Sequence, residues 1–260
     1  MELAMHTGGD SRTPLQLYEF RKACSSCSLR ELCLPVALSG LDIDALDKIV
    51  KRKGPLQKGD KLIRPGQPMT ALHAVLSGSL KSSTQDMNDE EQIIAFHLPG
   101  ELIGLDAIGS GKHSSTTEAL ETTSVCSIPF AELEALAHKI PSLQHQLLRI
   151  MSREIFDDHE LLQVSRRPAE QRLAVLLLNF SQRFGRRGMS RTRFRLPMSR
   201  QDLGNYLGLA PETTSRIFRR FVIQGLLSAT GKEIELLDLQ ALHGLKEESG
   251  GNTDLHAKRS

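Results

Sequence analysis

Four cysteines are placed so that their thiolates could act together. Three of them, Cys24, Cys27 and Cys33, lie within ten residues, and Cys126 lies far along the chain. Three soft thiolates so close together, completed by a fourth from a distant segment, can enclose an iron–sulfur cluster or a zinc ion. Zinc sites more often pair two Cys-x2-Cys hairpins or use histidine, so the spacing favours a cluster and leaves zinc as the alternative. The competing interpretation is that Cys126 is simply a small, buried, apolar side chain of a strand.

A second group of residues has the spacing and the chemistry of side chains that read DNA. Its members recur at positions i, i+3, i+4 and i+7 of one predicted helix and so share one face: Glu212, Ser215, Arg216 and Arg219. Arginine can donate two hydrogen bonds to guanine in the major groove, and glutamate can accept one from cytosine. Arg219, Arg200 and Lys232 are candidates for phosphate contacts. The alternative is an ordinary surface ion pair between Glu212 and Arg216.

The elements that must position these side chains form a predicted helix-turn-helix. Ser199 and Asp202 are spaced as the N-cap and third residue of a capping box, which predicts a helix over 200–207. Pro211 suits the first turn of the next helix, because no hydrogen bond is needed there from its nitrogen. The segment 227–237 is predicted to be a short hairpin, which would add a wing.

Charge is distributed unevenly along the chain, whose net charge is +2. Residues 165–232 contain fourteen Lys or Arg and three Asp or Glu, whereas the remainder contains nineteen basic and twenty-eight acidic residues. A basic half joined to an acidic half indicates nucleic acid as the partner of the basic half. A solvated arginine-rich surface is the plain alternative.

The segment from about 54 to 129 has the pattern of a β domain. Its short apolar runs are separated by Gly, Pro, Asn and Asp turns, which predicts an antiparallel sandwich or roll of many short strands. Three of these runs are 61–63, 72–76 and 92–96. A short amphipathic helix is predicted over 41–50. We expect the cysteine segment and the strands to form one domain over 21–140.

A long amphipathic helix is predicted over 141–164. It is longer than a typical helix, and its apolar stripe carries Glu154 and Asp158 where a purely structural seam would have Leu or Ile. A coiled-coil contact between two subunits would explain the length and the stripe, and a helix packed on its own domain explains the periodicity equally well. The candidate dimerisation residues are Leu147, Ile150, Met151, Ile155, Asp158 and Leu162.

Length and composition limit the class of protein. The chain has 260 residues, 39% hydrophobic and 25% charged, as expected of a globular protein with two domains. No apolar run approaches the roughly 20 residues of a membrane span, and no secretory signal is visible. We therefore expect a cytoplasmic protein with reduced thiols and no membrane partner. No residue pattern suggests catalysis, so an enzyme is not expected. Residues 1–20 are predicted to be a flexible tail and residues 248–260 a disordered one.

Taken together, these motifs resemble the fumarate–nitrate reduction regulator (FNR) branch of the cyclic-AMP receptor protein superfamily. The resemblance extends from about Cys24 to about Leu237. Besides the cysteines, its most specific parts are His97-Leu-Pro-Gly-Glu-Leu-Ile-Gly104 and Gly204-Asn-Tyr-Leu-Gly-Leu209, the second followed by Glu212, Ser215 and Arg216. It implies an α+β fold: an N-terminal β-roll sensory domain like a cyclic-nucleotide-binding domain, a long dimerisation helix, and a C-terminal winged helix-turn-helix over 165–247.

The resemblance also implies a cofactor and partners. In the family the four matching cysteines bind a [4Fe–4S] cluster that maintains a DNA-binding homodimer, and oxygen degrades this cluster, which changes anaerobic gene expression. The matching Glu, Ser and Arg read a TTGAT-type half-site in palindromic double-stranded DNA. Exposed loops of the sensory domain and the loop over 185–193 would contact RNA polymerase. Asp158 on a dimer seam would repel its symmetry mate and weaken association, as a switch requires.

One departure from the wider superfamily concerns its effector. That superfamily binds cyclic nucleotides through an Arg-Ser pair, where this chain has His113-Ser114 and no arginine between Arg64 and Arg149. Without a guanidinium for the cyclic phosphate, a cyclic nucleotide is not the expected effector. The rival functions are a DNA-binding regulator whose cysteines hold zinc or act as a thiol switch, and an iron–sulfur electron carrier, which would leave the basic half unused.

Overall fold

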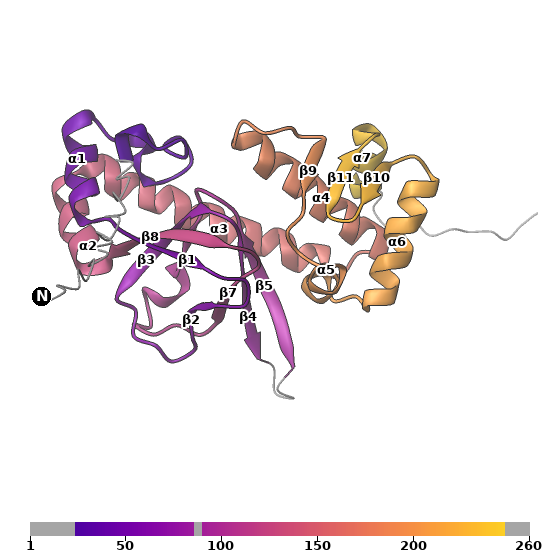
Figure 1. Cartoon of the computed structure of the whole chain (residues 1–260), viewed down its shortest axis with the longest axis horizontal. Helices are drawn as coiled ribbons and strands as arrows, with labels where there is room; N and C mark the ends of the chain where they lie inside the picture. Colours follow the sequence, from indigo (N-terminus) through magenta and orange to yellow (C-terminus); the bar gives the residue numbers. More distant parts are fainter. Residues whose placement is uncertain (1–23, 86–89, 248–260) are drawn as a thin grey trace, which may run out of the picture.

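The computed structural model describes residues 24–85 and 90–247 (Figure 1). An N-terminal part rich in strands is followed by a long helix and a C-terminal part in which helices surround a small sheet. This arrangement confirms the predicted α+β fold class. The tails predicted over 1–20 and 248–260 lie outside the described residues.

The N-terminal part is a β-roll made of two four-stranded antiparallel sheets. Their strand orders are β1-β8-β3-β6 and β2-β7-β4-β5. The strands are β1 (Lys51–Leu56), β2 (Lys61–Ile63), β3 (Ala71–Ser77), β4 (Leu80–Gln85), β5 (Glu91–His97), β6 (Leu102–Ile103), β7 (Thr116–Ala119) and β8 (Thr123–Pro129). The run Ala71–Val75 of β3 is buried, because β3 pairs with β8 and β6 and lies against the core. Strand β5 lies at the edge of its sheet.

Helices cover one end of the β-roll. They are α1 (Gly40–Ile49), α2 (Phe130–Lys139) and the first turns of α3 (Pro141–Val164), accompanied by short 3-10 turns at Cys24–Ser26, Leu34–Ala37 and Leu105–Ala107. Their apolar faces share one core with β3, β6 and β8. Helix α2 was not predicted, because Leu133 and Ala137 are the only fully buried positions in its ten residues and give too weak a periodic signal.

Helix α3 extends from α2 past the β-roll to the C-terminal part (Figure 1). It occupies the range in which the long helix was predicted. No helix in the described part of the chain is both long and apolar enough to cross a membrane.

The C-terminal part is a winged helix-turn-helix. Its elements are α4 (Ala169–Arg186), β9 (Arg193–Arg195), α5 (Arg200–Leu207), α6 (Pro211–Ile223), β10 (Leu227–Thr230), β11 (Glu233–Leu236) and α7 (Leu239–Glu247). The predicted capping box is present, since the Ser199 hydroxyl accepts from the Asp202 amide at 3.0 Å and the Asp202 carboxylate accepts from the Ser199 amide at 2.8 Å. The predicted hairpin is β10–β11, and β9 adds a third strand that was not predicted. Helix α7 was also not predicted.

Gly204 allows the two helices of the motif to approach closely. A Cβ atom at this position would lie 2.8 Å from both the Leu209 carbonyl oxygen and the Thr214 hydroxyl, closer than real Cβ contacts. The Leu209 amide donates to the Gly204 carbonyl at 2.8 Å, which fixes the turn. Helices α5 and α6 therefore form one rigid unit.

The β-roll and the C-terminal part share a hydrophobic core. Ile93, Phe96, Leu98 and Leu120 of the β-roll belong to the same buried cluster as the apolar face of α4. The Phe96 ring lies 5.1 Å from that of Tyr206 on α5, measured between ring centroids. The C-terminal part is therefore docked directly on the β-roll and not only connected through α3.

Candidate metal centre and nucleic-acid interface

The four cysteines line a single cavity of about 40 Å³. Cys24, Cys27 and Cys33 come from a loop of short turns, in which the amide of Cys27 donates to the carbonyl of Cys24 at 3.4 Å. Cys126 comes from the middle of β8, where it lies opposite Arg52 on β1 and Ala74 on β3. The structure therefore brings together residues that the sequence separates widely.

Burial dominates the chemistry of these thiols. It raises the pKa of Cys24 to about 12, with a further contribution from a hydrogen bond to Asp47, and it raises the pKa of Cys33 to about 12. Burial also raises the pKa of Cys126, although Arg52 opposes this. Thiolates are thus disfavoured in this apolar cavity unless a cationic centre replaces the protons.

All four thiols line this one cavity. In the described part of the chain, no three His, Cys, Asp or Glu side chains are arranged to hold a single metal ion. A zinc ion requires its sulfur ligands at about 2.3 Å from one point. A [4Fe–4S] cluster is held by four thiolates on different irons, so its ligands are spread more widely. Four cysteine thiols around one apolar cavity are the donor set that such a cluster requires.

A turn in the β-roll connects the cysteine loop to the C-terminal part. A Cβ atom on Gly100 would lie 2.8 Å from the Cβ of Leu32, so only glycine permits this packing against the residue before Cys33. The next residue, Glu101, accepts hydrogen bonds at 2.6 Å from Arg183 and from Arg187. Burial by itself would raise the pKa of Glu101, but the two guanidinium groups outweigh it and hold the pKa at about 2.

Arg183 and Arg187 had been counted from the sequence only as part of the basic half. Arg183 lies in the last turn of α4 and Arg187 is the C-cap residue just after it, and both follow the buried Phe180 and Phe184 by three residues. Their spacing from these two phenylalanines is the feature of the sequence that could have predicted that the arginines face the protein interior.

The predicted reading residues lie together on the exposed face of α6. The side chains of Glu212, Ser215, Arg216 and Arg219 are all exposed. The opposite face is buried and consists of Thr214, Ile217, Phe218 and Phe221. Figure 1 shows α6 on the side of the C-terminal part that points away from the β-roll. This face is therefore accessible to a large partner.

Arg200 and Lys232, the other predicted phosphate contacts, make contacts within the domain. The Arg200 guanidinium lies 3.3 Å from the centroid of the Phe218 ring, and burial lowers its pKa to about 10, so it stays charged at neutral pH. The Lys232 ammonium donates to the Pro197 carbonyl. Their role as phosphate contacts stays a prediction.

The stripe predicted for dimerisation is divided between two faces of α3. Leu147 and Ile150 pack against the core of their own β-roll. The exposed apolar side chains are Leu148 (58%), Ile155 (56%) and Phe156 (62%). Met151 is half-buried, and the side chains of Asp158 and Leu162 lie outside the described residues. Leu148 and Ile155 are seven residues apart, which is the spacing of a coiled-coil heptad. The sequence had indicated Leu147, one position earlier, as the first residue of this seam.

A second cavity, of about 250 Å³, lies between the β-roll and α3. Its described lining residues include Asp106 and Glu154 but no Lys or Arg. The Ser82 hydroxyl is hydrogen bonded to His97 at 2.8 Å and to Thr117 at 2.9 Å. Burial lowers the pKa of His97 to about 4, so this ring is uncharged at neutral pH. The cavity lacks the positive charge that a phosphate would need.

Comparisons with known proteins identify both parts of the chain. Residues 54–139 match the cyclic nucleotide-binding domain family, and residues 171–245 match the Crp-like helix-turn-helix domain family. The chain is 50% identical to the transcriptional activator protein FnrA of Stutzerimonas stutzeri over 89% of this chain and 94% of that protein. It is 47% identical to the fumarate and nitrate reduction regulatory protein of Escherichia coli (strain K12), over 84% and 88% of the two chains. The solved structure of FixK2 from Bradyrhizobium japonicum aligns with a TM-score of 0.68 at 30% identity, covering 77% of this chain and 98% of that one.

Proposed function

Because this chain belongs to the FNR-type transcription regulators of the cyclic-AMP receptor protein superfamily, we propose that it controls anaerobic gene expression in response to oxygen through a [4Fe–4S] cluster. Its relatives are DNA-binding transcription regulators, a non-enzymatic family, which confirms that the chain is not an enzyme. The observation that supports the proposed cluster is the single apolar cavity lined by cysteines from two distant segments.

Cys24, Cys27, Cys33 and Cys126 would hold the cluster. When bound, the cluster supplies an oxygen-sensitive connection between the cysteine loop and β8. Asp47 orients the loop, since its carboxylate accepts from the backbone amide of Cys24 at 3.0 Å. Arg52 lies beside Cys126, and apolar neighbours such as Leu46 and Ile128 exclude water from the thiols. An apolar surround disfavours the entry of charged and polar molecules but not of apolar ones such as dioxygen.

The chain would bind DNA as a homodimer. The proposed subunit contact uses the exposed Leu148 and Ile155 and the half-buried Met151 of α3, together with the residues predicted from the sequence, Asp158 and Leu162. Burial of the exposed apolar side chains supplies the attraction, and the Asp158 carboxylate limits it. A two-fold dimer would place two α6 helices in successive major grooves of a palindromic TTGAT-type site.

Other partners follow from the same family. Exposed residues around Met189, which is 55% exposed, form a loop that would contact RNA polymerase in the cytoplasm. A cyclic nucleotide is not the proposed effector, because the described lining of the second cavity has carboxylates and no guanidinium.

The decisive experiment combines metal analysis with DNA binding. We expect anaerobically purified protein to contain about four irons and about four sulfides per chain. It should bind a palindromic TTGAT-type duplex as a dimer, and air should remove the visible absorbance, the dimer in light scattering and the DNA binding together. One zinc per chain, together with DNA binding that is unchanged in air, would overturn the proposal of a [4Fe–4S] cluster. Failure to bind the palindrome in every state would overturn the DNA target.

A further inference from the structure

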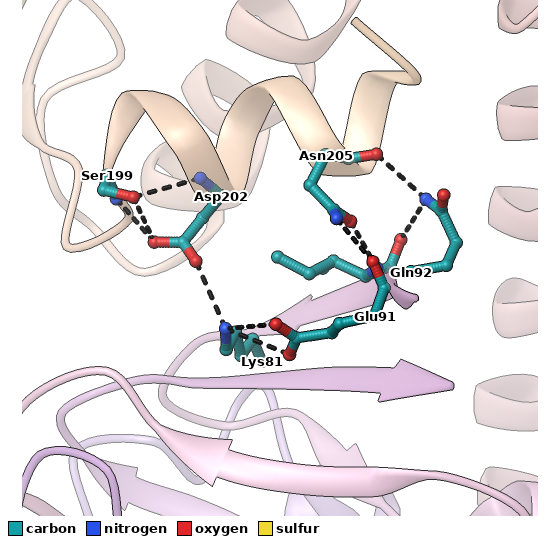
Figure 2. A network of polar contacts seen from close by, with 7 residues as sticks. Lys81, Glu91, Gln92, Ser199, Asp202 and Asn205 are labelled. Carbon is teal, nitrogen blue, oxygen red and sulfur yellow. Dashed lines mark hydrogen bonds and ion pairs between the residues drawn. The ribbon is translucent and has the colours of Figure 1, made fainter. Parts of the chain in front are cut away.

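The edge of the β-roll is closed by a side chain of the helix-turn-helix. Strand β5 is an edge strand, and its outward backbone groups at Glu91 and Ile93 face α5. The Asn205 side-chain amide donates to the Glu91 carbonyl at 2.6 Å and accepts from the Ile93 amide at 2.6 Å. Gln92 donates in turn to the Asn205 carbonyl at 2.9 Å (Figure 2). Asn205 thus pairs with the strand edge much as a further strand would.

An ion pair network lies next to this contact. The Lys81 ammonium on β4 lies 3.1 Å from the Glu91 carboxylate and 3.3 Å from that of Asp202 on α5 (Figure 2). The side chains of Lys81 and Asp202 are only 11% and 18% exposed. Burial alone would lower the pKa of Lys81, but the two carboxylates outweigh it and raise that pKa, so the lysine is charged at neutral pH.

Asp202 serves two structures at once. One carboxylate oxygen accepts from the Ser199 amide and hydroxyl and thereby caps α5, while the other accepts from Lys81. The first turn of α5 is therefore attached, through its own capping residue, to the sheet that contains β4 and β5.

We propose that Lys81, Glu91 and Asn205 are positioning residues for DNA recognition, acting as an interdomain latch. The latch rests on the proposed function, because its effect is exerted on the DNA-binding dimer. Glu101 holds α4, the ion pair between Arg195 and Glu121 holds β9, and the latch holds α5, so polar contacts attach the C-terminal part to the β-roll at three separate places beside the shared hydrophobic core. Of these polar contacts, the latch is the one made to the first helix of the helix-turn-helix, so it fixes the orientation of α5 and α6 relative to the β-roll.

This orientation matters because α5 and α6 move as one unit and α6 carries the reading side chains. Two reading helices must meet half-sites one helical turn apart, so their mutual orientation determines which spacing is bound. A C-terminal part that rotates freely loses more orientational freedom on binding and accepts a wider range of spacings.

The test measures spacing preference as well as affinity. Anaerobic dimers of Lys81→Gln are titrated with a palindrome of native spacing and with palindromes one base pair longer or shorter. We expect Lys81→Gln to bind the native spacing about tenfold more weakly, with little change on the altered spacings, so that its preference collapses. Lys81→Arg should restore the preference, and Lys58→Gln, at an exposed lysine of the same β-roll, should behave as the wild type.

A second readout does not require DNA. Hydrogen exchange at the Ile93 amide should be faster in Lys81→Gln and in Asn205→Ala, while exchange in α6 stays unchanged. Equal weakening on all three palindromes, or unchanged preference and unchanged exchange, would overturn the latch. If the wild type itself binds none of the palindromes, the proposed function fails, and the exchange measurement alone then decides whether the latch exists.

Discussion

The cysteine cavity and the reading face of α6 are opposite kinds of site. The cavity is apolar and buried, and burial raises the pKa of Cys24 and Cys33 to about 12, so these two thiols keep their protons at neutral pH. The reading face is exposed and carries its charges in water. A metal centre needs ligands from which competing water is excluded, whereas a DNA contact needs charges that remain solvated until the phosphates arrive. The thiols of the cavity would bind a metal centre, and the charged side chains of the reading face would bind DNA.

The region between them is neither apolar nor freely solvated. Glu101 with its two arginines, and Lys81 with Asp202, are charged groups that are largely buried and paired, while the second partner of Lys81, Glu91, is about half exposed. Such pairs add little net stability, but breaking one is costly because the remaining charge is left uncompensated. They are therefore suited to fixing orientation between the two sites.

The largest expected effect starts at the cysteine cavity and extends to DNA binding. Cys126→Ser should abolish iron binding and, with it, anaerobic binding to the palindrome, because a hydroxyl does not replace a soft thiolate. The fold should persist, since the substitution changes little volume at a half-buried position. Iron analysis, circular dichroism and anisotropy with labelled DNA check this. Ser25→Ala, at an exposed position of the same loop, should retain iron. Full iron occupancy in Cys126→Ser would show that β8 does not provide a ligand of the metal centre.

The next effect is confined to the reading face. Arg216→Ala should weaken binding to the palindrome by roughly 2–6 kcal/mol, because a base contact contributes about 1–3 kcal/mol and the dimer makes it twice. Iron content should not change, which would show that the two sites are chemically independent. Arg193→Ala, at an arginine that is 73% exposed on β9, is the matched control. Equal losses in the two variants would mean that Arg216 contributes only general positive charge.

The smallest effect tests the buried pair between the sites. Glu101→Gln should lower the free energy of unfolding by about 3 kcal/mol at pH 7, since Arg183 and Arg187 hold the pKa of this carboxyl well below its usual value. A depressed carboxyl pKa stabilises the fold above the unfolded pKa of 4.5 and loses that contribution as the pH falls towards about 2. The difference between the wild type and Glu101→Gln in urea unfolding should therefore shrink below about pH 4.5. Glu134→Gln, at an exposed glutamate, should show no such dependence. A difference that is constant with pH would contradict the assigned charge.

Local signals in the sequence were sufficient for much of the fold. The capping box at Ser199, the range of the helix over 141–164 and the short strands of the β-roll all depend on residues close to one another in the chain. The four candidate ligands were also identifiable, because cysteine is rare here and three of the four are clustered. Elements with few buried positions, such as α2, gave too little signal.

By itself the sequence determined which residue types were present and which local elements they formed. Only the tertiary structure decided which face of each element was used. It packed the half-buried Leu147 and Ile150 against the core and left Leu148 exposed, and it paired Lys81 with Asp202 across more than a hundred residues. Periodicity defines a stripe but not its partner, since the partner depends on how elements distant in the chain dock and on the free energy of burying each charge with its counter-charge.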